Sequence, residues 1–88
     1  MTRPPDGLTL RSQVGRRLYL RRVWLGLAQR EVADKAGVSR NFVSAIERGA
    51  QGLDAWRLGL VADALGVTLA WLLSGPDEMV TDTAPGTR

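Results

Sequence analysis

The sequence predicts an all-α domain, a compact bundle of five short helices. Apolar residues recur at helical spacing in five separate segments, and most of these segments stop at a glycine. The chain shows neither a strand-like alternation of apolar and polar residues nor an internal repeat. Its 88 residues suffice for one small domain, whose core would be marginally stable alone and would gain from dimerisation.

The first two expected helices cover residues 12–25 and 29–36. Gly26 and Gly37 end them, because glycine readily adopts the left-handed conformation that closes a helix. Spacings of three and four residues define their apolar sides. The residues on these sides are Val14, Leu18, Val32, Ala33 and Ala36.

The other three expected helices begin after residues that can cap a helix N-terminus. Ser39 precedes the third helix, Asp54 the fourth and Thr68 the fifth, and each offers a side-chain oxygen to the first backbone N–H groups. The fifth helix stops at Gly75, which a proline follows. The expected core residues of the third and fourth helices are Val43, Ile46, Leu58, Val61, Ala62 and Leu65.

Composition sets the domain boundaries. We expect a flexible arm over 1–11, the folded domain over 12–75, and a flexible tail rich in Pro, Gly, Thr and Asp over 76–88. The arm carries Pro4 and Pro5 instead of the apolar stretch of a signal peptide. No apolar run approaches the ~18 residues of a membrane span, so we expect a cytoplasmic protein without a membrane partner.

The missing residue types exclude much chemistry. The chain has no cysteine and no histidine, which removes disulfides, zinc fingers, most transition-metal sites and the usual nucleophile–base pairs. We therefore expect no metal, no cofactor and no enzymatic activity, and no small-molecule effector is evident.

Charge divides the chain into a basic and an acidic part. Residues 11–48 carry nine basic and three acidic side chains, a net charge of +6, whereas residues 49–88 carry two basic and five acidic ones, a net charge of −3. This asymmetry favours a polyanion as the partner of the first part. A solvated charged surface would show the same asymmetry, so the charge alone does not decide between them.

The second and third expected helices form a helix-turn-helix pattern. The tight turn Gly37-Val38-Ser39 joins them within the span of about twenty residues that this motif requires. The runs 29–39 and 43–49 resemble the lambda-repressor/Cro type of helix-turn-helix, the xenobiotic-response-element family, and the resemblance extends over 12–75. The stretch 39–49 is also similar to the controller proteins of restriction–modification systems. The resemblance implies binding of double-stranded DNA, and it places Trp71 in the core; Trp24 stays open between core and surface.

In such a protein the third helix enters the major groove with its first residues at the base edges. Arginine can bind guanine and asparagine can bind adenine through two hydrogen bonds each. Phe42 can touch a thymine methyl group or pack over the turn, and packing is favoured. The expected base contacts are Ser39, Arg40, Asn41 and Ser44.

Phosphate contacts are expected from the start of the second helix and from arginines. The dipole of a helix N-terminus favours an anion, and in the family a glutamine at the position of Gln29 contacts the DNA backbone. This chain has Ala28 where relatives carry a capping residue, and its loop 50–53 lacks the basic residues common in relatives. The expected phosphate contacts are therefore Gln29, Arg48, Arg16 and Arg17.

Arg22 and Glu47 match positions that form an ion pair in similar proteins. Each stands on a helix stripe that otherwise demands apolar residues, so mutual pairing explains both. We expect this pair to hold the third helix in place without touching DNA. Leu53, Trp56 and Leu60 form an additional apolar stripe, which predicts a dimer interface, although ordinary packing would also explain it.

These observations predict a homodimeric transcription regulator that binds a palindromic operator. Repression is favoured over activation, because Arg30 stands where an activator of this type would profit from a second acidic residue beside Asp34. A restriction–modification controller is an alternative. An antitoxin-type protein-interaction module is another, although the tail is short and poor in apolar residues.

Overall fold

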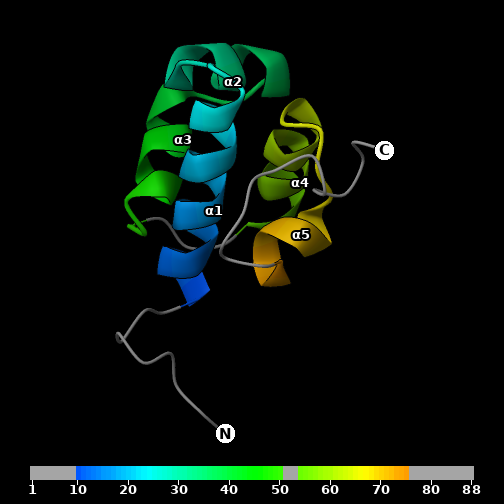
Figure 1. Ribbon diagram of the computed structural model, residues 1–88. Coiled ribbons are helices and arrows are strands. Elements are labelled where there is room, and N and C mark those ends of the chain that lie inside the picture. The colour runs from blue at the N-terminus through cyan, green and yellow to red at the C-terminus, as the bar shows by residue number, and fades with distance from the viewer. Residues whose placement is uncertain (1–9, 51–53, 76–88) are drawn as a thin grey trace, which may run out of the picture.

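The computed structural model describes residues 10–50 and 54–75. In this part of the chain it contains five α-helices and no strand, which confirms the expected all-α bundle with its helix-turn-helix (Figure 1). None of the described helices is long and apolar enough to cross a membrane. The helices are α1 (Leu10–Trp24), α2 (Gln29–Ala36), α3 (Arg40–Glu47), α4 (Ala55–Ala64) and α5 (Leu69–Ser74).

Helix α1 begins two residues before its expected start, at Leu10 instead of at residue 12. Residues 10 and 11, which the sequence assigned to the arm, therefore belong to the helix. The rest of the expected arm (1–9) and the expected tail (76–88) lie outside the described residues.

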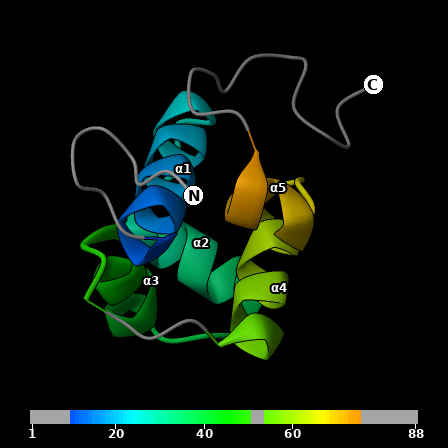
Figure 2. The ribbon, with the colours of Figure 1, turned by 90° about the horizontal axis from the view of Figure 1, so that it is seen from below.

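The helices pack as a closed ring of neighbours around one core. Helix α1 contacts α3 and α5, α2 contacts α3 and α4, and α4 contacts α5. Seen from below, α3 and α4 lie on opposite sides of α2 (Figure 2). All eleven core residues expected from helical spacing are buried, and Phe42, Val67, Trp71 and Leu72 complete the core. Trp24, which the sequence left open, is half exposed.

The three expected N-caps are formed. The side-chain oxygens of Ser39, Asp54 and Thr68 accept hydrogen bonds from the backbone N–H groups of Phe42, Trp56 and Trp71, at 3.0, 3.1 and 3.0 Å. Between α2 and α3, Gly37 adopts a left-handed conformation with φ of 74°, and its N–H donates to the carbonyl of Ala33 at 2.8 Å. A residue with a side chain would be strained there, so this glycine sets the angle between the two helices.

Gly15 brings α1 unusually close to α3. It is buried at the crossing of the two helices, and a Cβ atom added to it would overlap the carbonyl oxygen of Ile46 and lie 2.9 Å from that of Glu47. Only a residue without a side chain permits this approach. The backbone of α1 therefore supports the last turn of α3 directly.

Two arginines of α1 are buried and bind backbone carbonyls. Arg17 is 6% exposed and its Nη1 donates to the carbonyl of Leu72 in α5 at 2.9 Å. Arg21 is 3% exposed and its Nε donates to the carbonyl of Leu65, at the end of α4, at 3.0 Å. The prediction of a phosphate contact for Arg17 is wrong, because its guanidinium points into the protein and ties α1 to α5.

Candidate nucleic-acid interface

Helix α3 presents a polar face to the outside. Arg40 and Asn41 are exposed and Ser44 is half-buried, whereas Val43 and Ile46 point into the core. The exposed positions follow one another at the spacing of a single helix face. The structure thus places all the predicted base-contacting residues, with Ser39 at the cap, on one side of one helix. Only α3 and its cap contribute to this group of four residues.

Two of the predicted contact residues bind each other. Arg48 Nη1 donates a hydrogen bond to Ser44 Oγ at 2.5 Å, across one turn at the end of α3. This contact orients the Arg48 guanidinium along the exposed face of the helix. Ser44, predicted to contact a base, and Arg48, predicted to contact a phosphate, therefore form one polar unit.

Phe42 packs inward, as the favoured prediction states. Its side chain is only 4% exposed, and the guanidinium of Arg57 lies over its ring at 4.2 Å. Arg57 Nε also donates to Asp54 Oδ2 at 2.9 Å. Hydrogen bonds from the side chain and the backbone N–H of Arg57 lower the pKa of the Asp54 carboxyl. Arg57 thus joins the start of α4 to the start of α3.

Arg57 is a cation that sequence reasoning missed as part of this region. It lies outside the basic part of the chain, in the first turn of the fourth helix, and no role was predicted for it from the sequence. The stacking on Phe42 depends on a contact between residues fifteen positions apart, which helical spacing does not predict. The available signal was an arginine three residues after a capping aspartate.

Glu47 is the centre of a network that positions α3. Its carboxylate accepts hydrogen bonds from Arg22 Nε at 2.5 Å, from Arg22 Nη2 at 3.0 Å and from Gln29 Nε2 at 3.0 Å. Arg22 also donates through Nη1 to the carbonyl of Leu27 at 2.8 Å. The hydrogen bond to Glu47 raises the pKa of the Arg22 guanidinium. The predicted ion pair is confirmed, and it is only 13% and 7% exposed on its two sides.

Gln29 therefore has a second role that the sequence did not reveal. It is the first residue of α2, and its amide binds the carboxylate at the end of α3. A primary amide carries two N–H groups, so one remains for another acceptor. Through Glu47, the side chains at the end of α1 and the start of α2 hold the end of α3.

The N-terminus of α2 lacks a capping side chain, as Ala28 predicts. Instead the Glu31 carboxylate accepts a hydrogen bond from the backbone N–H of Ala28 at 2.7 Å. This is one half of a capping box, and it places a negative charge at the positive end of the helix. An anion bound here would meet that carboxylate, so the side-chain amide of Gln29 is the better anchor for a phosphate.

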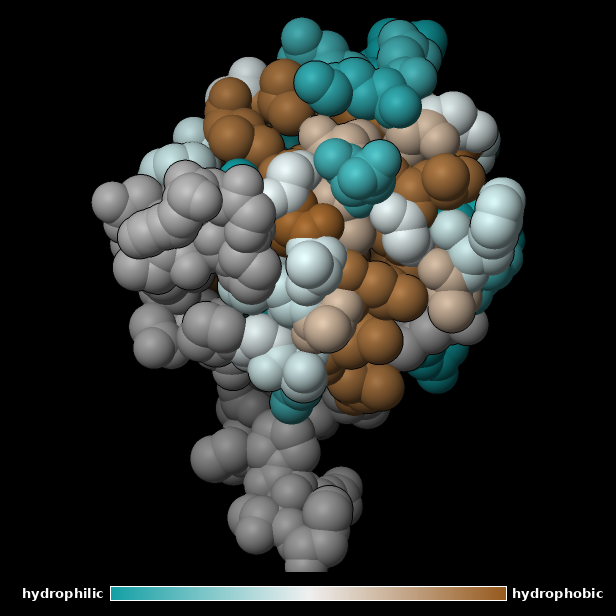
Figure 3. All heavy atoms as spheres, turned by 90° about the vertical axis from the view of Figure 1, so that its right-hand side faces the viewer, coloured by the Kyte–Doolittle hydropathy of each residue, from teal (hydrophilic) through white to brown (hydrophobic). Residues whose placement is uncertain are grey.

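The three residues of the predicted dimer stripe do not share one environment in the structure. Leu53 lies outside the described residues, Trp56 is 77% exposed, and Leu60 is partly buried against the core. Trp56, Leu60 and Ala64 are spaced by four residues along α4. Figure 3 shows the side of the molecule that carries α4 and α5, where apolar side chains form a band between polar ones.

Within 10–50 and 54–75, no group of three or more acidic side chains could hold a metal ion.

Comparison with known proteins places this geometry in context. A family described as helix-turn-helix matches residues 18–72. A protein of Neisseria meningitidis serogroup B called Neisseria hypothetical transcription factor is 36% identical over 74 residues, covering 84% of this chain and 70% of its own.

Two solved structures have the same fold. The crystal structure of a hypothetical transcription factor from Neisseria has a TM-score of 0.75 at 36% identity, covering 88% of this chain and 92% of its own. The restriction–modification controller protein C.Esp1396I, solved as a tetramer in complex with its natural 35-base-pair operator, has a TM-score of 0.67 at 28% identity. That alignment covers 74% of this chain and 86% of the controller chain.

Proposed function

Because the chain belongs to the helix-turn-helix family, we propose that it is a DNA-binding transcription regulator that acts as a homodimeric repressor on a palindromic operator. Helix α3 enters the major groove and reads bases through the side chains on its exposed face. Arg40 and Asn41 carry most of the sequence discrimination, because each can form two hydrogen bonds with one base. Ser39 and Ser44 add single contacts on either side.

This proposal rests on one observation. Helix α3 has a polar outer face and is held in place from both sides. Gly15 supports the backbone of its last turn, the Arg22–Glu47–Gln29 network holds its end, and Arg57 covers Phe42 at its start. A helix that reads bases needs this rigidity, since a displaced side chain loses its bidentate geometry. The interior contacts leave the side chains of Arg40 and Asn41 exposed.

Phosphate contacts position the domain on the duplex. We assign them to Arg48, to the exposed Arg16 on α1, to the second amide N–H of Gln29, and to Arg57. Arg57 compensates in part for the loop 50–53, which has no basic residue. These contacts strengthen binding to any sequence and weaken as salt concentration rises.

Dimerisation would join two reading helices on one operator. The exposed Trp56 at the start of α4, continued by Leu60 and Ala64, offers an apolar surface on a different helix from the reading face. The net charge of residues 49–88 is −3, so two copies meeting here avoid the repulsion of their basic parts. The controller protein that binds its operator as a tetramer supports assembly of several subunits on DNA as a mode of action for this fold.

A restriction–modification controller is the second candidate within the same class, and the likeness to C.Esp1396I is the observation that favours it. Selection of bound duplexes from a random pool, with the full chain, tests the proposal. We expect enrichment of a palindrome whose half-sites are centred about one helical turn, ~34 Å, apart. Enrichment of a single half-site would overturn the dimer, and a pool without enrichment would overturn sequence-specific binding.

A further inference from the structure

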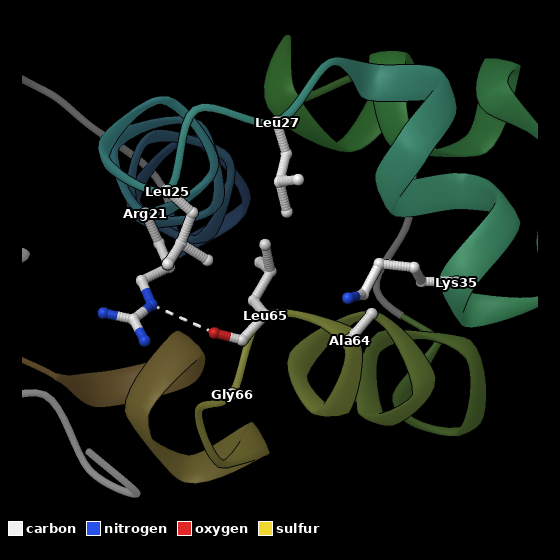
Figure 4. A pocket seen from close by; sticks show the side chains of 7 residues that line it. All are labelled: Arg21, Leu25, Leu27, Lys35, Ala64, Leu65 and Gly66. Carbon is white, nitrogen blue, oxygen red and sulfur yellow. Dashed lines mark hydrogen bonds between the residues drawn. The ribbon is translucent and has the colours of Figure 1, made fainter.

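A pocket of about 340 Å³ opens between the ends of α1, α2 and α4. Leu25 and Leu27 line it from the end of α1 and the following loop, and Ala64 and Leu65 line it from the end of α4 (Figure 4). Its volume falls within the range of about 300–1,000 Å³ that is usual for small-molecule sites. None of its lining residues belongs to α3, so the pocket is separate from the proposed DNA-contacting face of that helix.

Among the described residues, two cations and no carboxylate line this pocket. Lys35 extends from α2 with its ammonium group directed toward the hollow, opposite Arg21 at the far edge (Figure 4). Among the described residues, Lys35 forms no ion pair and Arg21 Nη1 has no hydrogen-bond partner, although Arg21 is almost fully buried. Burial lowers the pKa of the Arg21 guanidinium, because desolvation disfavours its charged form.

Protein groups offset these charges only in part. Arg21 Nε binds the carbonyl of Leu65, and the end of α4 contributes the partial negative charge of a helix C-terminus. Arg21 also lies over the ring of Trp24, at 5.0 Å from its centroid. The exposed Lys35 remains beside a partly apolar lining that is open to a ligand from solvent. A ligand with one negative charge and an apolar body would satisfy both features of the pocket.

We propose that the pocket between α1, α2 and α4 binds a small organic carboxylate with an apolar body. The carboxylate lies near the Lys35 ammonium, within the positive potential that Arg21 reinforces, and the apolar body packs against Leu25, Leu27 and Ala64, the apolar lining residues that keep exposed surface. This site is independent of the proposed DNA contacts. It connects α2, the first helix of the helix-turn-helix, with the end of α4.

Titration of the full chain with 4-phenylbutyrate tests the site, and the uncharged 4-phenylbutyramide serves as the matched probe. Amide resonances in two-dimensional NMR spectra at constant ionic strength report the binding position. Lys35→Gln removes one charge and Ala64→Phe fills the pocket without changing charge. Arg30→Gln removes a charge from an exposed position of α2 that does not line the pocket.

We expect saturable binding of the carboxylate with shifts centred on the lining residues, and binding of the amide weaker by about fivefold or more. Lys35→Gln should weaken the carboxylate by a similar factor, Ala64→Phe should remove binding, and Arg30→Gln should leave it unchanged. Should Ala64→Phe disturb the fold, Lys35→Gln alone decides. A carboxylate that fails to saturate, or that binds Lys35→Gln and Arg30→Gln equally well, would overturn the proposal.

Discussion

Arg22 binds Glu47 through two guanidinium nitrogens, at 2.5 and 3.0 Å, and so connects the end of α1 with the end of α3. Both side chains are mostly buried, so removing one partner leaves the other charge without compensation. We expect either Arg22→Ala or Glu47→Ala to lower the free energy of unfolding by about 1–4 kcal/mol. The double variant should cost less than the sum of the two, because the second change removes a charge that already lacks its partner. A chemical-denaturation cycle measures this, and simple additivity would contradict the pairing.

A side chain at position 15 would clash with α3, although the position lies in the middle of a helix, where alanine usually stabilises. Alanine normally stabilises a helix relative to glycine, but at Gly15 the new Cβ would collide with the backbone of α3. Gly15→Ala should destabilise by roughly 1–3 kcal/mol. Gly59 is the matched control, since a Cβ added there has nothing within 4 Å, and Gly59→Ala should stabilise by about 0.5–1 kcal/mol. Thermal unfolding of both variants checks the sign, and two changes of the same sign would refute the close approach.

Arg40 and Arg16 distinguish base recognition from phosphate contact. Arg40→Ala should cost about 1–3 kcal/mol on the selected operator and relax discrimination at one base position. Arg16→Ala should weaken binding to all duplexes by similar factors, because phosphates are the same in every sequence. Titrations against the operator and its single-base variants at one salt concentration provide the comparison. Unchanged base preference in Arg40→Ala would remove this residue from base recognition.

Trp56 tests the proposed dimer. Because Trp56 is 77% exposed, it contributes little to the core of one subunit, so Trp56→Asp should leave the fold intact. We expect this variant to be monomeric at micromolar concentration, with sharply reduced operator affinity. Val23→Asp, which alters a half-exposed apolar residue of α1, is the control and should remain dimeric. Sedimentation analysis of the parent and both variants decides, and a monomeric parent would disprove the dimer itself.

Asp54 predicts a pH dependence of stability. Its folded-state pKa is lowered by Arg57, so the charged carboxylate stabilises the fold at any pH above its unfolded value, about 3.9. This contribution is lost as the pH falls below that value and through the lowered folded-state pKa. Asparagine also caps a helix but carries no charge, so Asp54→Asn isolates the ionic part. The parent should exceed this variant in melting temperature at pH 7, and the difference should shrink toward pH 3. A difference that does not depend on pH would contradict the assignment.

Local patterns predicted the helices, their caps and the core. Helical spacing and capping act over three or four residues, so Ser39, Asp54 and Thr68 could be assigned from the sequence. The side of a helix that faces the core also follows from spacing, which is why Val43 and Ile46 are buried as expected. The resemblance to known helix-turn-helix proteins supplied the pairing of Arg22 with Glu47.

Long side chains and close backbone contacts escaped this reasoning. Arg17 looks like a surface cation in the sequence, yet its carbonyl partner is fifty-five residues away. Gln29 and Arg57 likewise have partners that become neighbours only after the helices pack. Gly15 resembles a weak helix position until α3 is placed against it. Each of these properties depends on tertiary distance, which composition and periodicity do not contain.

The contacts of α1 with both α3 and α5 have a consequence for the spacing of the operator. The backbone of α1 at Gly15 supports α3. Two residues further along α1, Arg17 donates a hydrogen bond to the carbonyl of Leu72 in α5. Within the described residues, helix α3 and the C-terminal helices are thus both fixed to α1, so they move together as one rigid unit. In the proposed dimer the distance between reading helices is then set at the subunit junction alone. One base pair inserted at the centre of an operator rotates its two half-sites by about 34–36° relative to each other. A rigid subunit cannot compensate for this rotation by bending.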